Sequence, residues 1–334
     1  MAGKIINTAG AYISCASSVV GKHEALGPMG HCFDVRDNTD LFGAKTWELA
    51  ESAMQKRAFE MLLKKGGYTV KDFEALFAGD LQNQCVGSAY GLLDFDIPYF
   101  GLYGACSTAA EGLMLAAMSV SAGHVSKCAA VTSSHFLAAE RQYRSPTEYG
   151  GMRSPTSQWT VTGAAAFAVG TSGEVEITHA LPGIVIEKGI KDTTNMGAAM
   201  APAAADTIMR YFELSGKSVA DVGAIITGDL GFEGGEILCE LLDREGLDIR
   251  SKYNDCGALI YDRIRQDKHA GGSGCGCSAV VLAAHFLKKL RSAELGDMLF
   301  IGTGAMMSPS SIQQGQYIPA VAHLVRLEGK GGKK

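Results

Sequence analysis

The sequence lacks a strong excess of either charge, since 30 lysines and arginines stand against 35 aspartates and glutamates, a formal net charge of −5. Proteins that bind nucleic acid usually carry a clear basic surplus, so we expect no nucleic-acid partner. No apolar run approaches the roughly 18 residues of a membrane-spanning helix. The first ten residues, MAGKIINTAG, lack the uninterrupted apolar core of a signal peptide. The composition, 47% hydrophobic and 19% charged, is typical of a compact globular protein.

The cysteines do not suggest a disulfide framework. There are nine of them, an odd number, scattered through apolar sequence, which is typical of a reducing compartment. Cys275 and Cys277 are separated by one residue and have no matching histidine pair, so we expect no metal site. The glycines at 272, 274 and 276 follow the charged segment RIRQDKHA and not a buried strand. They therefore do not form a dinucleotide-binding loop, and we expect no cofactor.

What the sequence does contain is an internal repeat. Residues 50–81 and 199–230 both read as a helix, a glycine turn, a short polar step and an apolar strand ending in Gly-Asp-Leu, with a constant offset of 149 residues. A second pair, GACSTAAEGLMLAA and GCGCSAVVLAAHFL, reads as a turn of small residues that opens an apolar helix. The repeat predicts an α/β fold of two duplicated halves, residues 1–172 and 173–334, with helices covering the sheets.

One thiol precedes the helix predicted in the first half. Thr108 and Glu111 match a capping box, so we expect the helix to begin next to Thr108. Residues 109–118 are apolar nearly all round, which is typical of a helix buried in the interior. Cys106 then lies just before the helix N-terminus, where backbone N–H groups and the helix dipole favour a thiolate. The alternative is an inert buried cysteine, because cysteine is among the most frequently buried residue types.

The motifs around this thiol resemble a known superfamily. The duplicated halves, the Ala-Cys-Ser-Thr-Ala turn around Cys106 and the stretch QWTVTGAAAFAVG are similar to the thiolase and ketoacyl synthase superfamily. The resemblance implies a five-layered α-β-α-β-α fold in which Cys106 occupies the position of the acyl-accepting nucleophile. It also implies a homodimer formed through the strand near residues 95–105.

A narrower resemblance is carried by DNTDLFGAKTWELAESAM, GDLQNQ, FGLYGACSTA, VTSSHF and RQYRSPTEYGG, which are similar to the stage V sporulation protein AD family. This resemblance implies a non-catalytic protein of spore-forming bacteria that binds dipicolinic acid, with or without calcium, and supports its uptake into the developing spore. It implies as partners the other membrane proteins of the same sporulation complex. The expected location is the cytoplasm or forespore, peripheral to the spore inner membrane through those partners.

The residues that a condensing enzyme would need beside Cys106 are absent. Type III ketoacyl synthases have a His-x-x-Asn and a Gly-Asn-x-Ser stretch in the second half. The corresponding places here read TGDLGFEGG, without histidine or asparagine, and AGGSGCGCSA, where Ser273 or a glycine replaces the asparagine. Losing one oxyanion donor alone costs about 2.7 to 4 kcal/mol. We therefore expect ligand binding; the alternatives are an acyltransferase that uses Cys106 and an acyl-CoA, with His269 as a substitute partner, and a structural scaffold.

Three further residues are expected near Cys106. Asp80 and Asp229 follow equivalent strands, and His135 ends the strand VTSSH, so these side chains are expected to approach one central cleft. The alternatives are that each aspartate caps a turn and that His135 is a buried, hydrogen-bonded histidine.

The segment ERQYRSPTEYGGMRSPTSQW, residues 140–159, is predicted to form a long loop or lid, because its prolines exclude a continuous helix. Dipicolinate is a flat pyridine ring with two carboxylates, which arginine forks and aromatic faces bind well. The residues expected to bind this ligand are Cys106, His135, Asp80, Tyr143, Arg144, Arg153, Trp159 and Asp229. The arginines and the tyrosine would cover the ligand. The alternative is that the arginines contact a partner or a second copy of the chain.

Overall fold

The computed structural model describes residues 3–143 and 154–332, without the side chains of residues 141–143 and 332. Within these residues no helix is both long and apolar enough to cross a membrane. The same residues contain no group of three or more His, Cys, Asp or Glu side chains placed to hold a metal ion.

Most strands of the described chain belong to one mixed sheet of twelve, which consists of two series of five strands and two short additions. The first series runs in the order β2 (Tyr12–Val20), β8 (Gly163–Gly170), β6 (Lys127–Ser134), β4 (Leu76–Gly79) and β5 (Tyr99–Gly101). The second runs β9 (Val175–Leu181), β14 (Ala320–Gly329), β13 (Asp297–Ala305), β10 (Ile225–Thr227) and β11 (Tyr253–Asp255). The additions are β1 (Ile6–Asn7) on β9 and β3 (Val35–Arg36) on β2.

The two series have the same pattern of pairing. In each series of five, the first two pairings are antiparallel and the last two are parallel, so the third strand has one neighbour of each kind. Parallel neighbours need crossover connections, which the helices supply. The series join through a short antiparallel pairing of β2 with β9, where Tyr12 faces Glu176. The link from Gly170 to Val175, which contains the predicted boundary at residue 172, connects them along the chain.

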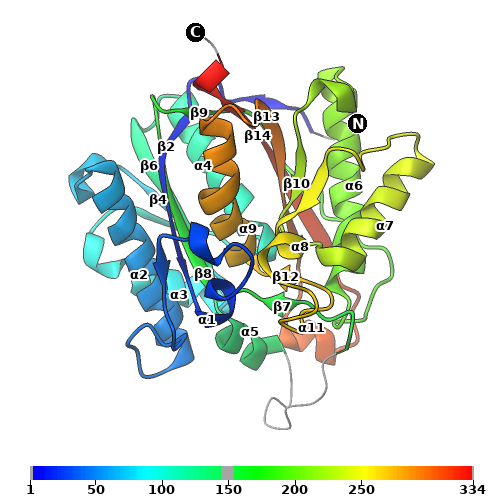
Figure 1. The fold of residues 1–334 in the computed structure, drawn as a ribbon, viewed down its shortest axis with the longest axis horizontal. Coiled ribbons are helices and arrows are strands. Elements are labelled where there is room, and N and C mark those ends of the chain that lie inside the picture. The colour runs from blue at the N-terminus through cyan, green and yellow to red at the C-terminus, as the bar shows by residue number, and fades with distance from the viewer. Residues whose placement is uncertain (1–2, 144–153, 333–334) are drawn as a thin grey trace.

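Helices form three layers around the two series (Figure 1). One outer layer holds α2 (Trp47–Gly66) and α3 (Val86–Leu92), and the other holds α6 (Met196–Ser215) and α7 (Gly231–Arg244). The central layer holds α4 (Thr108–Ser121) and a longer helix made of α9 (Cys275–Val281), a π turn (Leu282–Phe286) and α10 (Leu287–Arg291). The predicted five-layered α-β-α-β-α fold is confirmed.

The repeat predicted from sequence is also a structural repeat. Helices α2 and α6 begin and end 149 residues apart, and each stops at a left-handed glycine, Gly67 or Gly216. A single 3₁₀ turn follows in both halves, closed by a capping box at Thr69 in one and at Ser218 in the other. The same local signals therefore end the helix and lead into the next strand in both halves.

The start of α4 differs from the prediction. Its N-cap is Ser107, whose side chain makes no capping bond, and Thr108 is the first helical residue. The Thr108 hydroxyl donates to the carbonyl of Ala105 (2.7 Å) and accepts from the backbone N–H of Gly104 (3.1 Å). The predicted capping box of Thr108 and Glu111 is therefore wrong, because a 3₁₀ turn continues directly into α4 and uses the Thr108 hydroxyl to close itself.

Glycines on β13 let the start of α4 lie against that strand. A Cβ at Gly304 would stand 2.3 Å from the carbonyl oxygen of Gly104, and one at Gly302 would stand 2.9 Å from that of Ser107. No larger residue fits either position without moving the backbone. The contact brings the N-terminal end of α4, from the first half, to the carboxyl ends of strands in the second.

Several short elements lie in the lower part of the view in Figure 1: α1 (Lys22–Ala25), α5 (Phe136–Tyr143), α11 (Pro309–Gln313) and a two-stranded parallel ribbon of β7 (Trp159–Thr160) with β12 (Gly272–Ser273). The short helix α8 (Cys256–Ile260) lies above this ribbon in the same view. This ribbon carries the predicted site residue Trp159 on β7, and Ser273 on β12.

Candidate functional site

Cys106 lies in the 3₁₀ turn that opens α4 and is 5% exposed. The residue before it, Ala105, has a left-handed backbone with φ of 49°, a conformation that is unusual for a residue with a Cβ. The Cys106 Sγ is 3.9 Å from the Oγ of Ser273, which is the second residue of β12 and belongs to the second half of the chain. Such strained positions are found often at functional sites.

Asp229 is the carboxyl group linked to this thiol through Ser273. Its carboxylate accepts hydrogen bonds from the Thr303 hydroxyl (2.7 Å), the Gly274 N–H (2.8 Å) and the Ser273 hydroxyl (3.1 Å). Ser273 links this carboxylate to the thiol, because its Oγ also lies 3.9 Å from the Cys106 Sγ. The predicted approach of Asp229 to Cys106 is therefore seen in the structure. Its other contacts close the turn that leads from β12 into α9, so Asp229 is at once a capping residue and the neighbour of the thiol.

This arrangement keeps the thiol protonated. Burial raises the pKa of Cys106 well above its ordinary value, and the Asp229 carboxylate raises it further. Burial also raises the pKa of Asp229, against the lowering effect of its hydrogen-bond donors. A helix N-terminus favours a thiolate, but here the desolvated site and its buried carboxylate oppose it.

A second thiol, Cys275, lies beside the first. It belongs to a small buried cluster with Cys106, Leu81 and Ala139, and its thiol donates to the Ser133 carbonyl (3.0 Å). Cys275 begins α9, so the two thiols stand at the starts of the two central helices. Burial also raises the pKa of Cys275 well above its ordinary value. From the sequence, Cys275 was considered only as a poor zinc ligand, and its position beside Cys106 was missed.

Asp80, the counterpart of Asp229 in the repeat, makes different contacts. One carboxylate oxygen accepts from the Gln82 N–H (2.8 Å), and the other accepts from the N–H (2.7 Å) and hydroxyl (2.6 Å) of Ser88. These bonds close the turn between β4 and α3, as the capping alternative predicted. No described contact joins Asp80 to Cys106.

A buried glutamate next to Asp80 was missed. Glu51 on α2 accepts hydrogen bonds from the Ser133 hydroxyl (2.9 Å) and the Gln82 side-chain amide (2.9 Å). Burial, and then the Asp80 carboxylate, raise the pKa of Glu51 to about 8, so it is mostly protonated at neutral pH. The repeat places Met200 at the equivalent position of α6. This loss of symmetry, a glutamate where the other half has methionine on a buried face, was the signal in the sequence.

His135 is buried but makes its described contacts elsewhere. Its Nε2–H donates to the carbonyl of Asp40 (2.8 Å), and its ring lies 5.7 Å from that of Trp47. Burial lowers the pKa of His135, so the ring is neutral at pH 7. The Nδ1 atom has no hydrogen-bond partner among the described residues. No described contact joins the imidazole to Cys106, and His269 is half-exposed and bonded to Asp267.

Trp159 lies on the other face of the ribbon from Ser273. Thr160 is paired with Ser273 across the ribbon, so their side chains share a face. Trp159 is the neighbour of Thr160 on the same strand and therefore points to the other face. The indole stacks on the ring of Phe136 with 3.7 Å between centroids and approaches His23 at 5.1 Å. The Lys268 Nζ lies 3.0 Å from the centroid of the Trp159 ring. The ribbon thus separates an aromatic cluster with a buried cation from the thiol and its carboxylate.

Three predicted ligand-binding groups cannot be placed. Arg144 and Arg153 lie outside the described residues, as does the side chain of Tyr143. The structure therefore brings together Cys106 and Asp229, with Ser273 added, and leaves Asp80, His135 and Trp159 in separate contacts.

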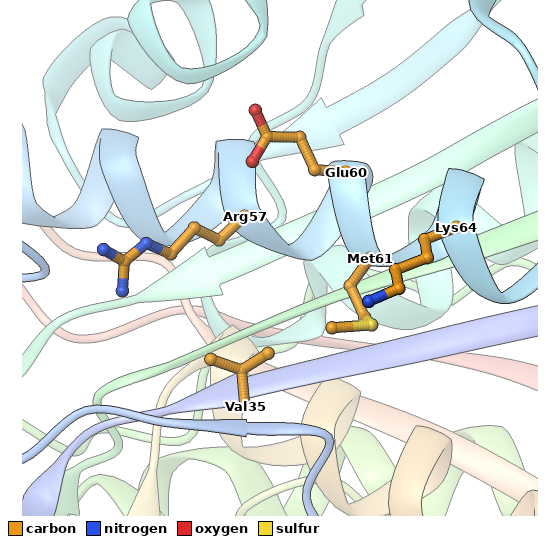
Figure 2. A pocket seen from close by; sticks show the side chains of 5 residues that line it. All are labelled: Val35, Arg57, Glu60, Met61 and Lys64. Carbon is orange, nitrogen blue, oxygen red and sulfur yellow. The ribbon is translucent and has the colours of Figure 1, made fainter.

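Two surface cavities lie away from the thiol. One, of about 250 Å³, is lined by Val35, Arg57, Glu60, Met61 and Lys64. Figure 2 shows Val35 facing Met61 across it, with Arg57 and Lys64 to either side and Glu60 turned away. The other, of about 430 Å³, lies where Asn195 and Arg263 meet the start of α7. Cys106 lines neither of them.

Comparison with known structures defines the class of protein. The chain resembles crystal structures of OleA from Xanthomonas campestris, one with a TM-score of 0.57 and 12% identity, covering 97% of this chain and 98% of that one. Another OleA variant, with cerulenin bound, has a TM-score of 0.56 and 13% identity, covering 97% and 96%. The fold, with a cysteine at the start of a buried central helix, is the thiolase fold.

Sequence comparison then gives the family. The model of the Stage V sporulation protein AD (SpoVAD) family matches residues 4–328. The chain is 41% identical to Stage V sporulation protein AD of Bacillus subtilis (strain 168) over 322 residues, which are 96% of this chain and 95% of that protein. The chain therefore belongs to the stage V sporulation protein AD family.

Proposed function

We propose that this protein binds dipicolinic acid, with or without calcium, and supports its uptake into the developing spore without acting as an acyltransferase. Membership of a stage V sporulation family supports the role in the spore. The observation that carries the non-catalytic part is the set of described contacts around Cys106, which supply the Ser273 hydroxyl at 3.9 Å, itself bonded to the buried Asp229 carboxylate, and no imidazole. A nucleophilic cysteine needs a partner that stabilises its thiolate, usually an imidazole, and a buried carboxylate does the opposite.

The ligand contacts that we propose lie around Trp159. Arg144, Arg153 and Tyr143 would bind the carboxylates and cover the ring, against the half-buried indole. Cys106, His135, Asp80 and Asp229 remain proposed ligand-binding residues. The described hydrogen bonds of Asp80 and Asp229 already engage both carboxylate oxygens, which favours a supporting role for the aspartates.

The test is thermal unfolding of the full chain with and without dipicolinate, with benzoate and acetyl-CoA as comparison ligands. A ligand at 100 times its dissociation constant stabilises the native state by about 2.7 kcal/mol, which a melting curve shows clearly. We expect stabilisation by dipicolinate, and a sharply weaker effect when Arg144→Lys and Arg153→Lys are combined. Absence of any dipicolinate effect would refute the proposal.

The competing function is an acyltransferase or condensing enzyme. The place of Cys106 in a thiolase fold favours it, and the missing histidine and asparagine oppose it. Stabilisation by acetyl-CoA alone, with an acyl group found on Cys106 by mass spectrometry, would establish it in place of the binding function.

The expected protein partners are proposals as well, and the structure offers an observation that favours one of them, the homodimer. We propose a homodimer through β5, an edge strand whose three residues are all exposed. Exposed apolar and aromatic side chains lie on β5 and in the segments before and after it: Val86, Tyr90, Leu93, Tyr99, Phe100 and Tyr103. Exposed apolar side chains at the edge of a sheet are typical of a protein–protein interface. We also propose that other membrane proteins of the same sporulation complex hold the protein at the spore inner membrane, from the cytoplasm or forespore.

A further inference from the structure

The cavity between β3 and α2 is separate from the site around Cys106 (Figure 2). Four of the five residues that line it lie on α2, at positions 57, 60, 61 and 64. Residues at this spacing share one face of a helix. The fifth, Val35 on β3, faces Met61 across the cavity, with Arg57 and Lys64 at either side. We refer to it as the β3–α2 cavity.

The two cations beside the β3–α2 cavity are available to an outside partner. Lys64 is exposed and has neither an ion pair nor a hydrogen bond with the described residues. Arg57 has one carboxylate nearby, Asp37, with 3.5 Å between Nη1 and Oδ2, and it donates from Nη2 to the Phe42 carbonyl (3.3 Å). A partly exposed ion pair of this length contributes little, and a guanidinium has five N–H donors, so most of its binding capacity remains. The Glu60 carboxylate is turned away from the cavity (Figure 2).

The other two basic side chains of α2 are held more closely. The Lys56 Nζ lies 2.5 Å from a carboxylate oxygen of Asp94, and the Lys65 Nζ lies 2.8 Å from one of Asp34. Neither lysine lines the cavity. On this helix, the cations without a close carboxylate are therefore the two beside the cavity, and they are the ones that an anionic partner would reach.

We propose that the β3–α2 cavity is a docking site for an acidic peptide segment of a partner protein. An apolar side chain of that segment would contact Val35 and Met61, and carboxylates on either side of it would pair with Arg57 and Lys64. The cavity, of about 250 Å³, is smaller than the roughly 300–1,000 Å³ of small-molecule sites, which favours a single side chain as its occupant. Methionine adapts its shape to different apolar partners, so Met61 suits such a contact.

The spacing of the charges defines the segment. Arg57 and Lys64 are seven residues apart on α2, which is about 10 Å along the helix. In an extended peptide, alternate side chains point the same way, and residues four apart are separated by about 13 Å. The long arginine and lysine side chains span the difference. The segment that fits therefore reads acidic, any residue, apolar, any residue, acidic. This proposal does not depend on dipicolinate binding.

The test is a titration of a fluorescein-labelled peptide, Glu-Gly-Leu-Gly-Glu, with the full chain in the absence of dipicolinate, followed by fluorescence anisotropy. Two comparison peptides, Gln-Gly-Leu-Gly-Gln and Glu-Gly-Ser-Gly-Glu, lack the charges or the apolar side chain. We expect saturable binding of the first peptide and weaker binding of both others. Added salt should weaken binding of the first peptide, because exposed ion pairs are screened.

Variants of the chain locate the binding. Arg57→Gln combined with Lys64→Gln should lower the affinity about two- to thirtyfold, the range for the loss of two exposed ion pairs. The matched control combines Lys56→Gln with Lys65→Gln, which removes the same charge from the same helix but away from the cavity, and it should bind as the parent does. Lys64→Gln alone removes no described contact, so its effect on binding is free of any effect on folding.

Each other outcome overturns the proposal. Absence of saturable binding, or equal binding of the three peptides, would show that the cavity does not recognise an acidic segment. Equal weakening in the control variant would assign the effect to the charge of the whole helix. Binding to phosphatidylglycerol vesicles that is lost in Lys64→Gln, without peptide binding, would replace the peptide with a lipid surface. Dipicolinate binding is measured separately, so all of these results leave the proposed function standing.

Discussion

Replacing Asp229 with asparagine should make Cys106 more reactive. At a partly screened site, two unit charges repel by about 2 kcal/mol at a separation of about 8 Å and by about 4 kcal/mol at about 4 Å, a factor of about 30 to 1000 in the thiolate population. Burial of Cys106 remains, so its thiol stays less acidic than one in water. We therefore expect Asp229→Asn to raise the rate of Cys106 alkylation about thirty- to a thousandfold at a fixed pH near 8.

The assay is alkylation by iodoacetamide, followed at Cys106 by peptide mass spectrometry from pH 6.5 to 9.5. The rate should rise with pH along a curve displaced to lower pH in the variant. Asp80→Asn is the matched control, because Asp80 is the repeat counterpart of Asp229, is also buried and accepts several hydrogen bonds, but has no described contact with Cys106. Losing acceptor bonds destabilises either variant by about 1–3 kcal/mol, so both are compared well below their melting temperatures.

Equal alkylation of Cys106 in Asp229→Asn and the parent protein would refute the reasoning. So would an equal increase in Asp80→Asn, because loss of buried acceptors would then open the site without any effect of the neighbouring charge. A faster alkylation of Cys106 in Asp229→Asn, without displacement of its pH curve, would also indicate that the site had opened and not that a charge had been removed.

Three further changes test other parts of the structure. Glu51 has a raised pKa in the native state, so the stability it confers is complete below its ordinary value of 4.5 and is lost as the pH rises towards about 8. Glu51→Gln should flatten this fall in the free energy of unfolding, which is at most about 1.4 kcal/mol per pH unit. Urea unfolding at pH 5, 6.5 and 8 measures the fall, and Glu60→Gln, at an exposed position, should leave it unchanged. Gly304→Ala would place a Cβ 2.3 Å from the Gly104 carbonyl oxygen and should lower the free energy of unfolding by about 1–3 kcal/mol. Gly296→Ala, whose Cβ would meet no atom within 4 Å, should lower it far less. Equal urea midpoints for the two variants would contradict the packing described for α4. Combining Tyr99→Asp with Phe100→Asp should give a monomer in sedimentation velocity with unchanged circular dichroism, and an unchanged dimer would place the interface elsewhere.

Local patterns in the sequence were enough for the repeat and for two α/β halves, while the five layers were expected from the resemblance to the thiolase and ketoacyl synthase superfamily. Helix ends at Gly67 and Gly216, and the polar steps after them, depend on neighbouring residues only, so they were readable without a structure. The all-round apolar stretch 109–118 likewise predicted a buried central helix, because burial on every side requires apolar side chains on every side. The absence of a histidine and an asparagine at the expected places of the second half was also visible in the sequence.

The composition of the site was decided by tertiary structure. Cys106 and Ser273 are 167 residues apart in the chain and meet because glycines at 302 and 304 admit the start of α4 to the backbone of β13. Asp80 and Asp229 follow equivalent strands, yet only Asp229 reaches the thiol, since Ser88 engages the carboxylate of Asp80. The same holds for His135, which hydrogen-bonds to Asp40, and for Lys268, whose burial against Trp159 no local pattern revealed. Local sequence thus determined the elements and the place of the thiol, while long-range packing decided which charges surround it.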